Sequence, residues 1–404
     1  MLRQPCPACV RLVRQSIRRE YSTGRLSDAW RSAQLTSRAL IGIKGQDARV
    51  FLQGLITNDI DKLEPSRTPT AALYSGFLSA SGRILHDAFI YPAAIDGTEG
   101  YLIDVHAASL KPLAVYMRRF ILRSRVSLSD QTSKFTLRAL YPARDGTSKP
   151  DVDGMLWQDA RSPSMGWRLL TTAQNPHPPS DAQIEVDERH YTMHRILQGV
   201  PEEPLDIISG RSLPSGSNMD YMNGAVDFKK GCYVGQELTA RTHHTGVVRK
   251  RTLPARLAPL HTNDDMALLL PHGYDPVPSA LASDDLPAPG TKLASHKSSV
   301  ANARPTGELG TSMRISDASG RYHEPITIGL AVVPLEPAAR AGEEGLFVTR
   351  NALMNSDREA GVNAAGGKGT SATDEMTSLP QRSASATQWR LRAFRPQHWP
   401  AAST

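Results

Sequence analysis

Apolar residues in the first third of the chain follow two periods, one typical of strands and the other of helices. A continuous apolar run at residues 39–43 predicts a buried strand. The helical period occurs at residues 48–56 and 110–121, where apolar side chains recur three and four positions apart. Strands and helices mixed in this order predict an α+β fold. Further strand-like runs lie at residues 72–78, 84–91 and 101–105.

Polar stretches separate these elements. Residues 79–82, Ser-Ala-Ser-Gly, have the composition of a hairpin turn between two of the strands. Residues 143–154 and 173–183 are rich in Pro, Asp, Ser and Thr, so we predict loops on either side of a small section with Trp157 and Trp167.

Two longer stretches interrupt the apolar pattern in the second half of the chain. Residues 258–305 contain many Pro, Ser and Ala, and we predict a poorly ordered excursion there. Residues 355–387 have too few apolar side chains to offset the entropy of ordering, so we predict disorder. Alternation returns at Trp389, Leu391 and Ala393, which predicts a last strand that docks back on its domain.

The first 21 residues have the composition of a mitochondrial targeting segment. They contain five arginines and one acid, Glu20, interleaved with apolar side chains. The run Arg19-Glu20-Tyr21-Ser22 predicts cleavage after Tyr21 and a mature protein in the mitochondrial matrix. A basic surface helix is the alternative interpretation. No apolar run reaches the roughly 18 residues that a membrane span needs.

Removal of residues 1–21 changes two conclusions from composition. The segment carries +4 of the formal net charge of +7, so the mature protein keeps +3 and has no electrostatic reason to bind nucleic acid. It also holds Cys6 and Cys9, so Cys232 is the single thiol of the mature chain. The remaining length, about 380 residues, predicts two or three domains.

The most informative stretch of the chain surrounds this thiol. It is Lys230-Gly231-Cys232-Tyr233-Val234-Gly235-Gln236-Glu237, in which the two glycines free the backbone and leave the thiol little steric cover. Residues 236–241 predict a helix, so Cys232 precedes a helix N-terminus and follows two lysines. Both surroundings favour the thiolate, which binds metal or attacks an electrophile. A small buried apolar residue is the alternative interpretation.

This run, followed by Arg241, resembles the signature of the YgfZ/GcvT-like family, and in particular of its mitochondrial branch, the iron–sulfur cluster assembly factors. The similarity extends through residues 38–253, whereas 258–305 and 355–387 have no counterpart. The other stretches that carry it are an N-terminal motif at 51–59, the hairpin Gly82-Arg83, a second motif with Tyr191, Arg195 and Gly199-Val200-Pro201-Glu202, the stretches 307–310 and 328–331, and the ending Phe394-Arg395-Pro396 with Trp399-Pro400.

The resemblance implies a three-part ring-like fold of the aminomethyltransferase type. Its parts are a ferredoxin-like first domain, a second α+β domain and a C-terminal β-barrel, with the cysteine loop at the surface near a central cleft. We therefore expect residues 22–250 to form two interleaved α+β domains that carry the Lys-Gly-Cys motif. Residues 251–354 and 388–404 would form the barrel, with a loop insertion near 258–305.

The resemblance also implies an assembly factor rather than an enzyme. Such proteins work with A-type scaffold proteins in making [4Fe–4S] clusters for aconitase, lipoate synthase and respiratory complex subunits. Clusters usually have four thiolate ligands, and the mature chain has one, so we interpret Cys232 as a ligand shared with a partner. The cluster type, and whether the chain donates a ligand or protects a transfer step, stay open.

Spacing suggests supporting roles for the neighbours of Cys232. Lys230 would stabilise the thiolate or an anionic cluster, and Gln236 with Glu237 would cap the helix or hold the loop. Glu237 and Arg241 are also spaced for an i, i+4 ion pair. Asp227 fits a cap or turn. The whole set of motif residues that we expect to support the site is Lys230, Gly231, Tyr233, Gly235, Gln236, Glu237 and Arg241.

Two kinds of enzyme are alternatives. The same superfamily includes the folate-dependent aminomethyltransferase of glycine cleavage, for which Asp104 is the nearest candidate carboxylate, although the Asn-Ala pair expected on its strand is missing. Tetrahydrofolate held without turnover in a cleft near Asp104, Tyr191 and Arg195 is a related alternative. A thiol nucleophile would need a histidine base. The candidates are His190, His194, His243 and His244, of which the last two are also considered as nitrogen ligands or simple loop residues.

Overall fold

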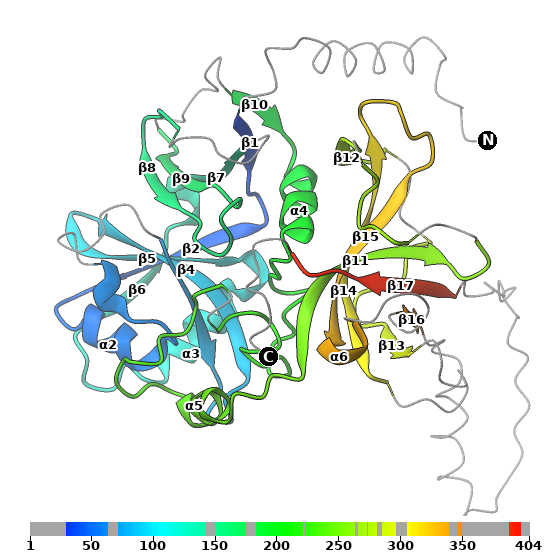
Figure 1. Ribbon diagram of the computed structural model, residues 1–404. Helices are drawn as coiled ribbons and strands as arrows, with labels where there is room; N and C mark the ends of the chain where they lie inside the picture. The colour runs from blue at the N-terminus through cyan, green and yellow to red at the C-terminus, as the bar shows by residue number, and fades with distance from the viewer. Residues whose placement is uncertain are drawn as a thin grey trace, which may run out of the picture.

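The computed structural model of this protein describes three β-sheets with few helices (Figure 1). The described residues are 30–63, 72–142, 150–174, 183–220, 223–262, 266–272, 274–280, 285–295, 305–338, 346–349 and 388–396. The predicted presequence 1–21 and the predicted disordered segment 355–387 lie outside them, as does Trp399-Pro400.

The first sheet carries the elements that local periodicity predicted. Its order is β3-β4-β5-β2-β6, and all of its pairs are antiparallel. Helices α2 (Ala48–Leu55) and α3 (Leu110–Arg118) bury their apolar faces against it, as the helical spacing predicted. The strands are β2 (Arg38–Lys44), β3 (Leu73–Leu78), β4 (Ile84–Ile95), β5 (Thr98–His106) and β6 (Ser127–Asp130), and short 3-10 helices lie at Ile60–Leu63, Ala107–Ser109 and Thr132–Lys134.

The strands of the second sheet come from before and after those of the first sheet in the sequence. Its order is β10-β1-β7-β9-β8, and β1 is parallel to β10 and antiparallel to β7. Because β1 joins this sheet while the next strand, β2, joins the first, the chain passes between the two units. Helix α4 (Glu188–Leu197) then leads toward the barrel. The strands are β1 (Trp30–Gln34), β7 (Phe135–Pro142), β8 (Met155–Gln158), β9 (Trp167–Thr172) and β10 (Gln183–Val186).

The third sheet closes into a barrel. Strands β14-β13-β16-β17-β11-β15 follow one another, and β15 pairs back with β14. The predicted last strand is confirmed as β17 (Trp389–Ala393), which lies between β11 and β16 and buries Trp389, Leu391 and Ala393. The other elements are β11 (Lys250–Pro259), β12 (Pro276–Pro278), β13 (Lys292–Ser295), β14 (Gly307–Asp317), β15 (Ile326–Pro334), β16 (Leu346–Thr349) and α6 (Leu335–Ala338).

The stretch 258–305 differs from the prediction of a poorly ordered excursion. Strand β12 pairs with β14, and β13 lies between β14 and β16, with Leu293 and Ala294 buried. These strands are three and four residues long and gain their backbone partners from strands far along the sequence. Composition therefore does not reveal β12 and β13, because these strands are held in place by their pairing partners and not by local apolar spacing.

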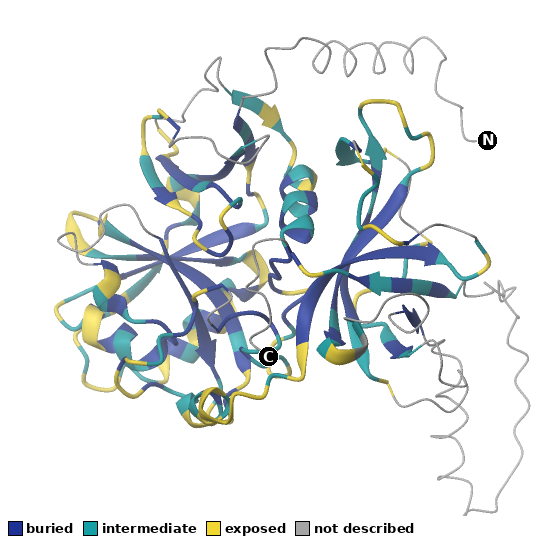
Figure 2. Cartoon of the chain, in the orientation of Figure 1, coloured by how far each residue is buried: buried dark blue, intermediate teal, exposed yellow. Residues whose placement is uncertain are grey.

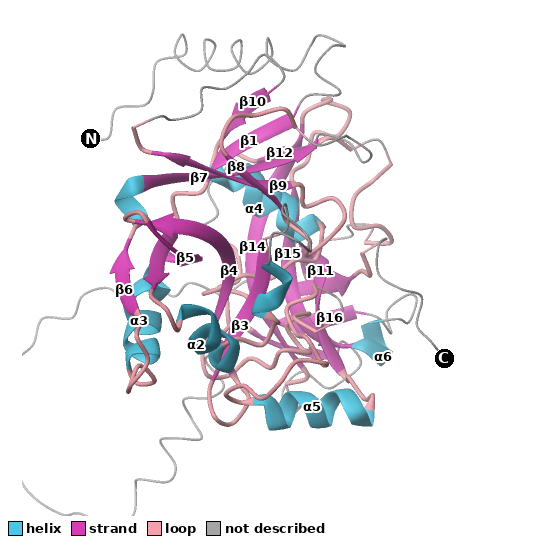
Figure 3. Ribbon diagram, turned by 90° about the vertical axis from the view of Figure 1, so that its left-hand side faces the viewer, coloured by secondary structure: helices cyan, strands magenta, loops and turns pink. Residues whose placement is uncertain are grey.

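Burial is concentrated in the sheets, as Figure 2 shows. Helix α5 (Gln236–Thr245) is largely exposed and buries only Thr239. Figure 3 shows α5 along the lower edge of the molecule, below α2. Among the helices that the structure describes, none combines the length and hydropathy needed to cross a bilayer.

Candidate functional site

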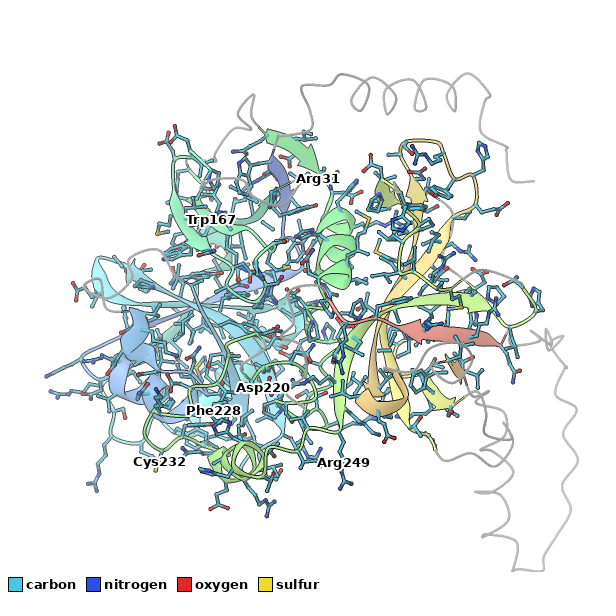
Figure 4. The ribbon with its side chains drawn as sticks, viewed as in Figure 1. Arg31, Trp167, Asp220, Phe228, Cys232 and Arg249 are labelled. Carbon is cyan, nitrogen blue, oxygen red and sulfur yellow. The ribbon has the colours of Figure 1, made fainter. Side chains whose placement is uncertain are left out.

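Cys232 lies exposed in a loop directly ahead of α5, as the sequence predicted (Figure 4). The residue before the helix, Gly235, has φ of +81°, a conformation that costs a residue with a Cβ about 1–2 kcal/mol. The chain turns at this glycine, so the thiol lies before the turn and the helix after it. Cys232 is thus an accessible thiol, and the alternative of a small buried residue is wrong.

Lys230 lies buried below this loop. Its ammonium donates to the carbonyl oxygens of Gln53, Ile56 and Asn58 at 2.7, 2.7 and 2.9 Å, which uses all three of its N–H donors at the C-terminal end of α2. Its Nζ also lies 4.9 Å from the centre of the Tyr233 ring. Burial lowers the pKa of Lys230 to about 8, although Asp59 and Asp227 act in the opposite direction. Lys230 therefore anchors the loop to α2. Its expected role in stabilising the thiolate or a cluster stays a prediction.

The N-terminal motif at residues 51–59 forms the other side of this anchor. Thr57 Oγ1 donates to the carbonyl of Ala225 at 2.6 Å, and Asn58 Nδ2 donates to the carbonyl of Gly224 at 2.8 Å. The backbone N–H of Val234, two residues after the cysteine, donates to the carbonyl of Gly54 at 3.1 Å. Two motifs that are far apart in the sequence are therefore one structural unit, in which the first holds both ends of the cysteine loop.

The hairpin with Gly82 packs against the cysteine loop where the loop meets α5. A Cβ on Gly235 would lie 2.3 Å from the carbonyl oxygen of Ser79, and one on Gly82 would lie 2.7 Å from Cβ of Leu238. Both positions therefore require glycine for close approach. Gly231 differs, because a Cβ there would have no atom within 4 Å. The space beside Gly231 is therefore open.

The remaining motif residues divide into buried and exposed ones. Tyr233 is buried, and burial raises its pKa to about 12. Gln236 is half-buried, whereas Glu237 and Arg241 are exposed. In the described chain no ion pair joins Glu237 to Arg241, so the i, i+4 pair suggested by their spacing is not formed. Asp227 accepts from the backbone N–H of Lys229 at 2.7 Å, which confirms a turn residue, and pairs with Lys62 at 2.7 Å.

The histidines do not form a catalytic pair with Cys232. His243 stacks on Phe228 with ring centres 3.8 Å apart, and His244 lies next to it. His190 and His194 are on α4, where they bond to Asp187 and to the carbonyl of Ser164. Within the described residues no hydrogen bond joins Cys232 to a histidine, and no three His, Cys, Asp or Glu residues are grouped as a metal site.

The three residues expected near a folate cleft lie in one buried network. Asp104 is fully buried and accepts from Arg38 Nε at 2.6 Å, from Arg168 at 2.7 Å and from the Tyr91 hydroxyl at 2.8 Å. The Tyr191 hydroxyl donates to Glu202 at 2.6 Å. Arg195 donates to Asp206 at 2.5 Å and to the hydroxyl of Thr311 on the barrel strand β14 at 3.2 Å. The structure thus brings Asp104, Tyr191 and Arg195 together, but each has protein partners.

Charge in this network is balanced. Its ion pairs join four arginines to four carboxylates in the described chain, namely Arg38, Arg161, Arg168 and Arg195 with Asp104, Asp159, Glu202 and Asp206. Burial alone would raise the pKa of Glu202, but Arg161 and Arg195 lower it well below its usual range. The guanidinium carbon of Arg168 lies 3.8 Å from the centre of the Phe89 ring. Buried charges of this kind persist only when paired.

Most residues of this network carry no clear signal in the amino-acid sequence. Arg168 stands between Trp167 and Leu169 in a strand, and a charged residue inside an apolar run is the signal that was available. Arg161 has no such signal, because it lies in a turn. It pairs with Asp159 two residues earlier and with Glu202 from a distant part of the fold.

Several known proteins that are similar to this chain carry the same name. The chain is 35% identical over 322 residues to a protein of Mycosarcoma maydis named iron–sulfur cluster assembly factor IBA57 homolog, mitochondrial, across 78% of this chain and 76% of that protein. It is 38% identical over 242 residues to the mouse protein named iron–sulfur cluster assembly factor IBA57, mitochondrial. This match covers 57% of this chain and 67% of that protein. The match to a Pyricularia oryzae homologue, at 42% identity, covers 56% of that protein. No family model matches the chain.

Among solved structures, the chain is similar to the glycine cleavage system aminomethyltransferase T from Bartonella henselae. The TM-score is 0.53 at 13% sequence identity, and the match covers 83% of this chain and 85% of that one. At this identity the similarity concerns the fold alone. It confirms the predicted α+β fold of the aminomethyltransferase type, with its C-terminal β-barrel.

Proposed function

The chain belongs to the IBA57 family of mitochondrial iron–sulfur cluster assembly factors, and on this premise we propose that Cys232 is a ligand to a cluster shared with a partner protein. The single observation that carries the proposal is the presentation of the thiol. Cys232 is exposed, while the residues on both sides of it are tied to α2 and to the hairpin.

This presentation suits a shared ligand for a physical reason. A ligand that must meet a cluster held by another protein loses less conformational entropy when its loop is already ordered. Lys230 and the N–H of Val234 order the backbone on either side of the cysteine. The space beside Gly231 is open. The motif therefore presents the Cys232 side chain at the surface from an ordered loop.

The ligand count supports a partner. The chain has three cysteines, of which two lie in the predicted presequence, so one thiolate remains where a cluster usually has four. We propose that an A-type scaffold protein supplies the others and that the products are [4Fe–4S] proteins such as aconitase, lipoate synthase and respiratory complex subunits. In this proposal residues 22–250 present the thiol, and the barrel of residues 251–354 and 388–404 braces them.

We do not extend the proposal to folate chemistry or to a thiol enzyme. Asp104, Tyr191 and Arg195 are already hydrogen-bonded within the protein, and the four candidate histidines have other contacts or lie exposed. The proposed role is therefore that of an assembly factor, with the cluster as cargo.

The test is anaerobic cluster reconstitution of the protein, alone and mixed with an A-type scaffold protein. Wild type is compared with Cys232→Ser and with Lys229→Ser, a matched change at an exposed neighbour. We expect a coloured complex that co-elutes for wild type and Lys229→Ser and is lost for Cys232→Ser, measured by visible absorption and gel filtration. Colour and co-elution that do not depend on Cys232 would refute the proposal.

A further inference from the structure

A cavity of about 600 Å³ lies where the α+β part of the molecule meets the barrel. We call it the junction groove. Residues 205–217 form one wall, the turn after α5 forms another, and the N-terminal end of β14 forms the third. A second cavity, of about 240 Å³, shares Leu213, Ser215, Thr242 and Val248 with it, so the hollow continues along α5.

The rim of the junction groove carries an excess of positive charge. Five cationic side chains and two carboxylates line it. Asp206 is neutralised by Arg195 from outside the groove, and Glu308 pairs with Arg211 and Lys292. Arg83, Arg249 and Lys250 remain as lining cations with no ion pair in the described chain.

The same groove carries exposed apolar side chains. Leu205 is 43% exposed and Val247 is 59% exposed, and both line it. Exposed apolar side chains framed by charge are typical of a surface that another protein covers. An isolated small anion needs charge and hydrogen bonds, but it gains nothing from this apolar surface.

The groove is also connected to the cysteine loop. Helix α5 begins four residues after Cys232, and its Thr242 lines the groove. The turn that follows the helix supplies Val247 and Arg249. Figure 4 shows Cys232 and Arg249 on either side of α5 along the lower edge of the molecule. One helix thus joins the exposed thiol to the groove, on the same edge.

We infer that the junction groove is the docking site for an acidic segment, with apolar residues among its acids, of the partner protein that shares the cluster. The inference rests on the proposed function, since it concerns the partner that meets Cys232. Charge complementarity selects the acidic segment, and Leu205 and Val247 receive its apolar side chains. Docking there holds the partner beside α5, so its own thiolates meet Cys232 without a large interface around the thiol itself.

The test uses the full-length protein and a cluster-loaded A-type scaffold protein under anaerobic conditions. Arg249→Glu with Lys250→Glu reverses two rim charges, and both residues are exposed. Arg119→Glu with Arg123→Glu makes the same change in charge at and just beyond the end of α3 and is the matched control. Affinity is measured by titration calorimetry at about 50 and about 300 mM salt. Hydrogen exchange of the wild-type complex is followed at residues 205–217 and 245–250.

We expect the groove variant to bind the scaffold at least about tenfold more weakly at low salt, with a smaller difference at high salt, because the lost attraction is electrostatic. The control should bind like wild type, and scaffold should slow exchange in both groove segments. With saturating scaffold, the groove variant should regain the cluster spectrum, because Cys232 is intact.

Three results would overturn the inference. They are wild-type affinity of the groove variant, an equal loss in the α3 control, and a complex that leaves exchange in the groove unchanged. Protection of the groove by millimolar citrate but not by scaffold would assign it to small carboxylates instead and would also overturn it. In each case a spectrum that still depends on Cys232 keeps the proposed function, whereas independence from Cys232 refutes that proposal separately.

Discussion

Replacing Lys230 with methionine tests whether this residue acts on the cysteine loop or on the cluster. Methionine has a similar length and no charge, so it removes three hydrogen bonds to the carbonyls of Gln53, Ile56 and Asn58 with little change in volume. Hydrogen bonds from a charged donor contribute about 1.5–3 kcal/mol each, or roughly 4–9 kcal/mol for the three.

The cost of burying the ammonium reduces this expected loss of stability. The pKa of Lys230 falls from 10.5 to about 8, and its largest cause is burial of the charge. A depression of this size corresponds to about 3 kcal/mol against the ammonium, a cost that methionine avoids. The difference leaves a net loss of stability on the order of 3 kcal/mol for Lys230→Met.

The assay is urea unfolding followed by fluorescence, with Lys229→Met as the matched control. Lys229 is exposed, and its side chain has no ion pair in the described chain, so this variant should stay within about 0.5 kcal/mol of wild type. Hydrogen exchange should also rise in residues 48–58 and 228–238 of Lys230→Met. If Lys230→Met keeps wild-type stability and exchange but loses the cluster with scaffold, the lysine acts on the cluster and the anchoring argument is wrong.

Three further predictions concern the loop and the buried network. Cys232→Ser should unfold within about 0.5 kcal/mol of wild type, since the thiol is exposed, yet cells lacking the wild type should not regain lipoate synthase or aconitase activity; full rescue would contradict this. Gly235→Ala should lose more than about 2 kcal/mol in urea unfolding because of its φ of +81° and the 2.3 Å approach to Ser79, whereas Gly231→Ala should be nearly neutral; equal losses would contradict the packing. Glu202→Gln should lose about 3 kcal/mol at pH 7, because it breaks a buried charge network. The pKa of Glu202 is lowered in the fold, so its contribution to the free energy of unfolding is present above pH about 4.5 and is lost as pH falls. Glu202→Gln should therefore lose stability less steeply than wild type between about pH 4.5 and 2, and parallel curves of stability against pH would refute this.

The spacing of apolar residues within short segments located several helices and strands correctly. The helices at α2 and α3, the hairpin of β3 and β4, and the last strand β17 lie where the apolar spacing placed them. Each of these has an apolar face within one short segment, so neighbours in the sequence carry the information. The motif around Cys232 was likewise visible, because a cysteine between two glycines ahead of a helix is a local pattern.

Contacts between distant segments decided the rest. Strand β13 is ordered because β14 and β16 pair with it, and Arg161 is buried where Glu202, 41 residues later in the chain, pairs with it. The orientation of the Lys230 side chain is also decided by contacts with a distant segment. Sequence places its charge two residues from the thiol, but the ammonium bonds to the end of a helix some 170 residues earlier, at Ile56 and Asn58. A buried charge goes where the fold offers acceptors, and only the tertiary structure brings those acceptors within reach.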